Sequence, residues 1–174
     1  SIYAASSSRY IDQIAVSSDS EDILFTSNFV SRHLTIRLDS LKRSSNLSED
    51  SSTTESVIDD FIKNSSYLED NDIIVLMQPT SPFRHNNLID KLIEGVNQDD
   101  FSSCLTVNER SPFFWNVYGE KSVSRPLYDP KHRKRRQDMN HGDIRIQENG
   151  NLYGFTVSGY KQCGHRSPFR STVV

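Results

Sequence analysis

The feature that most constrains the fold is a short apolar run near the middle of the chain, which a polar turn follows at once. Residues 73–77 read Ile-Ile-Val-Leu-Met, too short for a helix and without alternation of apolar and polar side chains. This pattern is typical of a strand buried on both faces, as at the centre of a parallel sheet. The next five residues, 78–82, read Gln-Pro-Thr-Ser-Pro, so an amide and two hydroxyls follow the strand's carboxyl end.

The polar end of this strand has a functional and a structural interpretation. In an open α/β sheet, ligands bind at the carboxyl ends of the strands, which makes Gln78, Thr80 and Ser81 candidates for ligand contacts. The alternative is that these residues only form a turn that caps the next helix. The local sequence leaves both interpretations open.

Length, charge and cysteine usage limit the class of protein. The 174 residues suffice for one domain with a real core, although the hydrophobic fraction of 34% is low. The net charge of −3 argues against a general nucleic-acid binder. No apolar run approaches about 18 residues, which excludes a membrane span. Cys104 and Cys163 have no metal-ligand or redox spacing, so we expect reduced thiols in a cytoplasmic protein.

Strands and helices alternate over the first 108 residues. We expect helices over 1–10, 21–31 and 87–96, and strands over 14–16, 34–38, 73–77 and 102–107. Asp19 or Ser20 can cap the second of these helices. The polar stretch 40–56 is either a disordered linker or the approach to a packed helix that Thr53 or Thr54 opens. The alternation predicts a parallel α/β sheet with right-handed crossovers.

The pattern changes in the second part of the chain. Residues 111–129 carry five aromatic side chains, and residues 131–136 read Lys-His-Arg-Lys-Arg-Arg. Such a basic run is most often a solvated loop, and it is also compatible with a nucleic-acid patch or with arginine recognition of a carboxylate or phosphate. Further on, Asn149 and Gly150 predict a turn that enters a strand.

Five sequence motifs occur together in one order along the chain. They read V-S-S-D-S-E-D-I, R-S-S-N-L-S-E-D-S-S-T-T, L-M-Q-P-T-S-P-F-R, R-R-Q-D and E-N-G-N-L-Y. This order resembles the N-acylneuraminate cytidylyltransferases, which are the CMP-sialic acid synthetases, over roughly residues 1–160. The third and the last two motifs favour this branch over the related CMP-Kdo synthetases.

The resemblance implies both a fold and a reaction. The fold would be α/β, a Rossmann-like nucleotidyltransferase with a mostly parallel sheet, in a single domain over residues 1–174 with a small dimerisation element at 111–147. That element would also shape the sugar pocket. The reaction would transfer CMP from CTP to a nine-carbon α-keto acid sugar and release pyrophosphate, with Mg²⁺ neutralising the developing charge. The implied partners are CTP, the acidic sugar and further copies of the protein in a homodimer or larger homo-oligomer.

Roles for the nucleotide side of the site follow from the same resemblance. Arg43 and Thr54 match positions in the nucleotide pocket, and Gln78 matches a catalytic glutamine between nucleotide and sugar. The structural alternative for Arg43 is an ordinary surface arginine. Positioning and electrostatics dominate phosphoryl transfer, so such residues would act mainly by orienting the substrates.

Roles for the sugar side fall later in the chain. Arg136, Asn149 and Tyr153 match positions that line the pocket for the acyl sugar and also include Gln78. Arg136 is the natural partner for the sugar carboxylate. The structural alternatives are a turn residue for Asn149 and a core aromatic for Tyr153.

The chain also departs from the family pattern. Family members begin with a strand and a Ser-Lys-Gly loop that cradles the CTP phosphates, and they carry a metal-binding Asp-x-Asp motif, whereas this sequence contains neither. It begins at Ser1 inside a helix-like segment, Lys161–Val174 holds no aspartate, and Gln147 replaces an aromatic or arginine. We therefore expect a fragment without metal ligands that is inactive by itself. Two alternatives stay open: a synthetase for CMP-Kdo, CMP-legionaminate or CMP-pseudaminate, and a non-catalytic module that binds a partner or nucleic acid through 131–136.

Overall fold

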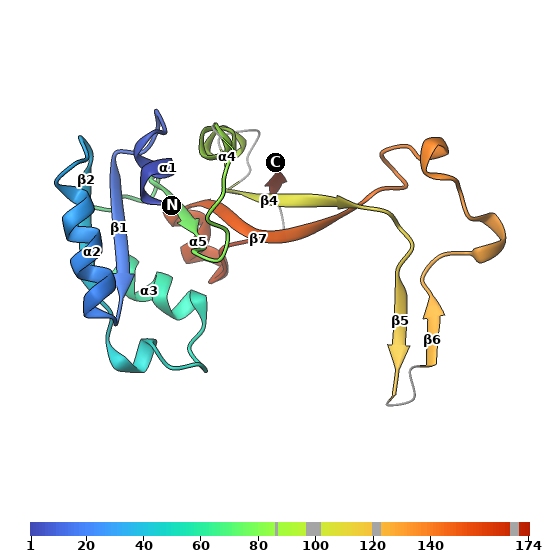
Figure 1. Ribbon diagram of the computed structural model, residues 1–174, viewed down its shortest axis with the longest axis horizontal. Coiled ribbons are helices and arrows are strands. Elements are labelled where there is room, and N and C mark those ends of the chain that lie inside the picture. Colours follow the sequence, from blue (N-terminus) through green and yellow to red (C-terminus); the bar gives the residue numbers. More distant parts are fainter. Residues whose placement is uncertain (86, 97–101, 120–122, 168–170) are drawn as a thin grey trace. The chain divides into compact units, whose positions relative to one another are not determined.

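The computed structural model describes residues 1–85, 87–96, 102–119, 123–167 and 171–174 (Figure 1). These residues form two compact units. Unit 1 comprises Ser1–Thr106 and Gly150–Val174, and unit 2 comprises Val107–Asn149. Each unit is described by itself. The chain folds as a mixture of helices and sheets, as the alternating pattern predicts.

The first layer of unit 1 is a parallel pair of strands. β1 (Gln13–Ser18) pairs with β2 (Arg37–Lys42), and Ile14 lies opposite Leu38. Helix α1 (Ile2–Ser6) precedes them, and α2 (Glu21–Ser31) connects them. The bounds of α2 agree with the prediction because the Ser20 hydroxyl accepts a hydrogen bond from the Ile23 amide. The strand expected at 34–38 was placed too early, since β2 begins only at Arg37.

A four-stranded sheet forms the second layer, in the order β3-β7-β4-β8. Its strands are β3 (Ile73–Met77), β7 (Arg145–Thr156), β4 (Ser103–Arg110) and β8 (Thr172–Val173). β4 and β8 are parallel, as expected, whereas β7 runs antiparallel to β3 with Phe155 opposite Ile74. The sheet is therefore mixed.

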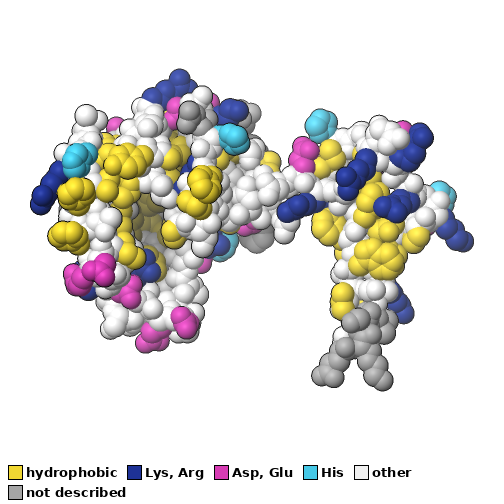
Figure 2. All heavy atoms as spheres, in the orientation of Figure 1, with side chains coloured by type: hydrophobic (Ala, Val, Ile, Leu, Met, Phe, Trp, Pro, Cys, Tyr) yellow, Lys and Arg dark blue, Asp and Glu magenta, His cyan; other side chains and the backbone are white. Residues whose placement is uncertain are grey.

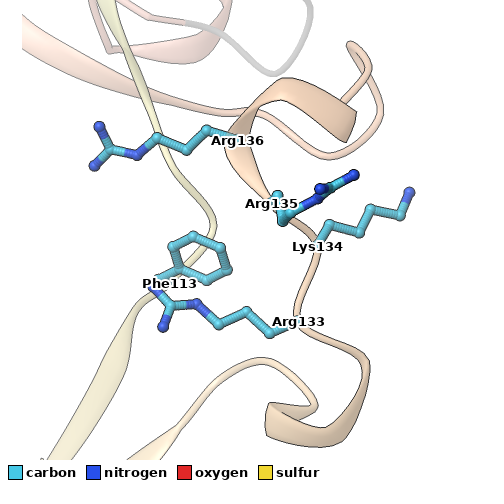
Figure 3. Close-up of a pocket in the computed structure, with 5 residues that line it drawn as sticks. All are labelled: Phe113, Arg133, Lys134, Arg135 and Arg136. Atoms are coloured by element: carbon cyan, nitrogen blue, oxygen red, sulfur yellow. The ribbon is translucent and has the colours of Figure 1, made fainter.

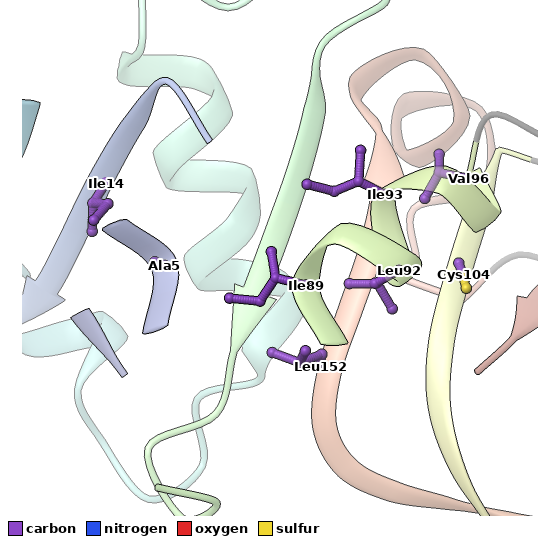
Figure 4. Close-up of a cluster of buried hydrophobic side chains, with 8 residues drawn as sticks. All are labelled: Ala5, Ile14, Ile89, Leu92, Ile93, Val96, Cys104 and Leu152. Atoms are coloured by element: carbon purple, nitrogen blue, oxygen red, sulfur yellow. The ribbon is translucent and has the colours of Figure 1, made fainter. Parts of the chain in front are cut away.

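The core of unit 1 gathers around helix α4 (Leu88–Val96), whose apolar face is the one that the spacing predicts. Leu92 is fully buried on this helix. Gly154 on β7 lets the helix approach closely, because a Cβ there would lie 3.1 Å from both Leu92 and Val96. Figure 4 shows the buried cluster, which consists of Ala5, Ile14, Ile89, Leu92, Ile93, Val96, Cys104 and Leu152.

Three local expectations need correction or a decision. The run 73–77 is half-buried along its whole length, rather than buried on both faces, because β3 is an edge strand of its sheet in the described part of the chain. No turn separates Asn149 from the strand that follows. β7 continues through Gly150, whose φ of 67° is typical of a bulge. The stretch 40–56 is not a disordered linker, since α3 (Thr54–Asn64) follows the cap residue Thr53.

Unit 2 is built from a small hairpin and two short helical turns. β5 (Trp115–Tyr118) pairs antiparallel with β6 (Val123–Pro126), and the turns span Pro130–His132 and Arg136–Asp138. The Tyr128 ring joins the hairpin to the preceding segment, at 6.2 Å from Trp115 and 5.1 Å from Phe113 between ring centroids. The unit encloses the region 111–147, apart from residues 120–122, which lie outside the described residues.

Candidate nucleotide and sugar site

The Gln78 turn lies directly after β3, and backbone hydrogen bonds fix it. The Gln78 amide donates to the Asn151 carbonyl at 3.1 Å. Its own carbonyl accepts from the Ser81 amide at 3.3 Å and from Arg84 Nη2 at 2.7 Å. The side-chain amide of Gln78 makes no hydrogen bond within the described residues. It is therefore available to a ligand at the carboxyl end of a strand.

Arg43 is not an ordinary surface arginine, because it joins the carboxyl ends of two strands. It follows β2, and its amide donates to the Ser18 carbonyl at 2.9 Å. Its guanidinium donates to the Ser17 carbonyl at 2.7 Å and to the Ser17 hydroxyl at 3.2 Å. No carboxylate of the described residues lies within ion-pair distance of Arg43, so its positive charge stays available for a phosphate.

Thr54 is the first residue of α3, while the neighbouring Thr53 caps the helix by accepting from the Ser56 amide at 3.1 Å. The Thr54 hydroxyl makes no hydrogen bond in the described part of the chain. The next residue, Glu55, pairs with the Arg166 guanidinium, and His165 Nε2 lies 3.4 Å from the same carboxylate. The start of α3 is thus held by the segment that follows α5 (Val157–Cys163).

Tyr153 is a core aromatic, as its structural alternative states, but a cation covers its ring. It lies on β7 opposite Leu76 and is only 4% exposed. The Arg166 guanidinium carbon lies 4.7 Å from the ring centroid. Arg166 lies outside the five motifs, so the sequence gave no signal for this contact.

A buried tyrosine on α5 also escaped the motifs. The Tyr160 hydroxyl donates toward Asp59 and toward the Glu55 carbonyl, each at 3.0 Å. Burial and the neighbouring Asp59 carboxylate raise the pKa of Tyr160 far above its usual range. The aromatic residue on an otherwise polar helix turn was the only available sequence signal.

Arg136 and Asn149 belong to unit 2. Within the basic run, Lys134 lies 2.8 Å from Asp143 and Arg135 lies 2.6 Å from Asp138, whereas no carboxylate of the described residues pairs with Arg136. Asn149 lies on β7, and its Nδ2 is 3.5 Å from Asn108 Oδ1, so its alternative role as a turn residue is excluded.

The basic run lines a small hollow together with an aromatic ring. In Figure 3, Arg133 and Arg136 extend on the Phe113 side, whereas Lys134 and Arg135 extend away from it. The Arg133 guanidinium carbon lies 4.2 Å from the Phe113 ring centroid, and the hollow has a volume of about 270 Å³. Two cations without carboxylate partners beside an aromatic face favour an anionic ligand.

The structure brings some of the predicted residues together. Gln78 and Tyr153 are close, because the Gln78 amide bonds to Asn151, two residues before Tyr153 on the same strand. No hydrogen bond or ion pair of the described residues joins Arg43 or Thr54 to Gln78. Each of these two residues lies at the start or end of its own element of unit 1.

Magnesium, which the resemblance implies, does not fit the described residues. No group of three or more His, Cys, Asp or Glu side chains among them is placed to hold a metal ion. The carboxylates of α3 are already engaged, Glu55 with Arg166 and Asp59 with Tyr160. Mg²⁺ requires several oxygen ligands in near-octahedral geometry. We therefore assign no metal ligand in this chain.

The fold and the site together define a Rossmann-like nucleotidyltransferase, with polar candidates at the carboxyl ends of its strands. A family model described as cytidylyltransferase matches residues 1–163, and the chain belongs to this family.

Two curated relatives narrow the similarity. The chain is 31% identical over 156 residues to N-acylneuraminate cytidylyltransferase of Oncorhynchus mykiss, which covers 88% of this chain and 33% of the relative. It is 29% identical over 123 residues to N-acylneuraminate cytidylyltransferase B of Danio rerio, which covers 69% of this chain and 28% of the relative. The chain thus spans a third or less of the length of these relatives. Within the described residues, no helix is both long and apolar enough to cross a membrane.

Proposed function

We propose that the complete protein transfers CMP from CTP to an N-acylneuraminate-type, nine-carbon α-keto acid sugar. The anomeric hydroxyl of the sugar attacks the α-phosphorus of CTP, a new oxygen–phosphorus bond forms, and pyrophosphate leaves. The observation that carries this proposal is the Gln78 turn, which presents a free amide at the carboxyl end of β3 within the motif shared with the family. The names of the two relatives support the sugar class.

The residues of this chain would bind and orient the two substrates. Arg43, whose charge is free of carboxylates, would contact a phosphate or ribose oxygen, and Thr54 would offer its hydroxyl to the same nucleotide. Gln78 would orient the sugar against the nucleotide through its amide. Arg136 would bind the sugar carboxylate, since a guanidinium matches a carboxylate in two parallel hydrogen bonds.

Two further features belong to this proposal. The complete protein would work in the cytoplasm as a homodimer or larger homo-oligomer. Unit 2 would supply the contact between copies, because its aromatic hairpin is largely exposed. Holding the substrates in reactive geometry accounts for a large part of such catalysis, so a partner that steadies unit 2 would favour turnover.

The test is the release of pyrophosphate by the product of the complete reading frame. CTP is offered with N-acetylneuraminate, Kdo, legionaminate and pseudaminate in separate reactions. We expect the highest kcat/KM with N-acetylneuraminate, whereas preference for another sugar would favour one of the related synthetases. The absence of turnover with every α-keto acid sugar would contradict the proposal. The 174-residue chain is a further arm, for which we expect no turnover because its described residues fit no metal site.

The sugar role of Arg136 has a matched control in the same run. We expect Arg136→Gln to raise the KM for the sugar at least about tenfold, as for the loss of a charged hydrogen bond, with little change for CTP. Arg135→Gln removes the same charge from a side chain that already pairs with Asp138, so both KM values should stay close to wild type. Equal losses for sugar and CTP in the Arg136 variant would refute the assignment.

A further inference from the structure

Arg84 holds the Gln78 turn, although no role from the motifs accounts for it. Its Nη2 donates to the Gln78 carbonyl at 2.7 Å, and its Nη1 donates to the Ser1 hydroxyl at 2.9 Å. Its Nε is buried and has no hydrogen-bond partner. The side chain therefore lies against the backbone of the turn, at the carboxyl end of β3.

The charge of Arg84 has no counter-charge in its surroundings. No Asp or Glu of the described residues lies within ion-pair distance of its guanidinium. Burial lowers the pKa of Arg84, although an arginine remains protonated in proteins. Taking a cation out of water is unfavourable unless it is paired or hydrogen-bonded. An anion that reached this edge of the sheet would supply the missing counter-charge.

Arg84 constrains the turn more than its fold requires. The backbone of Gln78 is already fixed by the bond from its amide to Asn151 and by the bond from Ser81 to its carbonyl. The turn can therefore form without Arg84. The third bond restricts the direction of the Gln78 carbonyl, and with it the direction in which the side-chain amide leaves the backbone.

We propose that Arg84 is a positioning residue of the substrate site, which orients Gln78 through its carbonyl and attracts an anionic substrate through its unneutralised charge. This inference rests on the proposed function for the substrate, while the orientation of Gln78 stands on the geometry alone. An error of about 1 Å in a positioning group can cost on the order of a hundredfold in rate, so the effect is measurable.

The kinetic test compares three variants of the complete protein. We expect Arg84→Met to lower kcat between about tenfold and a hundredfold and to raise the KM of at least one anionic substrate. Arg84→Lys keeps the charge but not the planar fork, so it should restore the KM and leave kcat low. Arg32→Met is the matched control, because Arg32 is exposed at the end of α2 and has no ion-pair partner among the described residues. Its kcat and KM should stay at wild-type values.

A second measurement does not depend on turnover. Hydrogen exchange of a peptide that covers residues 77–83 in the complete protein reports on the Ser81 amide, which donates to the same Gln78 carbonyl. We expect exchange in this peptide to be at least about tenfold faster in Arg84→Met than in wild type, which corresponds to about 1.4 kcal/mol of lost protection. A core peptide over residues 152–157 should not change.

The outcomes separate the two proposals. If the wild-type protein shows no turnover while exchange responds as expected, the proposed function fails and the orientation of Gln78 by Arg84 stands. Wild-type kinetics and unchanged exchange in Arg84→Met would overturn the inference. Equal losses in kcat and thermal stability for the Met and Lys variants would also overturn it, because they would indicate a purely structural role.

Discussion

The two units of this chain differ in how they bury apolar surface. Unit 1 encloses Leu92, Leu152 and Phe155 completely. Unit 2 contains no buried side chain among its described residues, and Trp115 and Val117 are 51% and 68% exposed. A lone two-stranded hairpin is marginally stable in water. The difference indicates that unit 1 can fold on its own core, whereas unit 2 depends on surfaces supplied from elsewhere.

The exposed apolar side chains of unit 2 indicate what that surface is for. They follow the hairpin and its flanks, and Figure 2 shows them at the surface. Contiguous exposed apolar patches usually mark interaction sites. A second copy of the chain is the partner that the proposed homo-oligomer requires. Four experiments, in order of decreasing expected effect, can break or sharpen this comparison.

The largest effect should come from the core of unit 1. Phe155→Ala removes a fully buried ring that packs 5.4 Å from the Tyr160 ring, so the free energy of unfolding should fall by about 3–5 kcal/mol. Phe25→Ala is the matched control, because Phe25 is 73% exposed on α2. Urea denaturation measures both variants. Comparable losses in the two would show that the core is not where the structure places it.

The next effect concerns association through unit 2. Trp115→Ala should raise the dissociation constant of the homo-oligomer about tenfold or more, because a large exposed aromatic is a common anchor of an interface. Val117→Ser tests the same strand without removing an aromatic contact within the unit. Sedimentation of the complete protein over a range of concentrations gives the constants. An unchanged constant in both variants would exclude the hairpin from the interface.

A smaller effect should come from the polar contact that joins two helices of unit 1. Tyr160→Phe removes the hydroxyl that bonds to Asp59 and to the Glu55 carbonyl, and it should cost about 1–3 kcal/mol near neutral pH.

The pH dependence of this contact gives a sharper check. The folded state raises the pKa of Tyr160, so its contribution is fully present below the unfolded pKa of about 10. It is lost as the pH rises above that value toward the folded pKa. The difference in stability between wild type and Tyr160→Phe should therefore shrink above about pH 10. A constant difference across this range would contradict the assigned cause.

The smallest effect is expected on the surface of unit 2. Arg135→Gln breaks a pair with Asp138 in which the side chains are 73% and 45% exposed. Exposed pairs of this kind contribute about 0–1 kcal/mol, so the melting temperature of the chain should hardly change. The same variant also bears on the open alternative of a binding module. Strong, salt-dependent binding of nucleic acid that this substitution weakens would support that alternative.

The sequence predicts elements well where a local interaction sets their limits. α2 begins where expected because Ser20 caps it and Glu21 and Asp22 follow, and α4 carries a clear apolar face. β7 was missed in part, because Gly150 resembles a turn residue while the neighbouring strands hold it in an extended ladder. The half-burial of β3 depends on which strands flank it, and no local pattern contains that information.

The candidate site shows the same division. Gln78 could be placed at the end of a strand from its neighbours alone, and the structure confirms that position. The bonds from Arg43 to Ser17 and from Arg84 to Gln78 could not be foreseen. The first joins residues that are 26 positions apart, and the second depends on the path of a Pro-rich turn. The metal and the oligomeric state stay predictions.

The open edge of β3 has a practical consequence for work with this chain. Its five apolar residues are only half-buried, and within the described residues the strand pairs on one side alone. An apolar edge strand is a template for pairing with other chains, and β-rich apolar segments of this length can nucleate aggregates. Preparations of the isolated chain should therefore lose soluble material with time and concentration. A charged substitution on this strand would slow that loss.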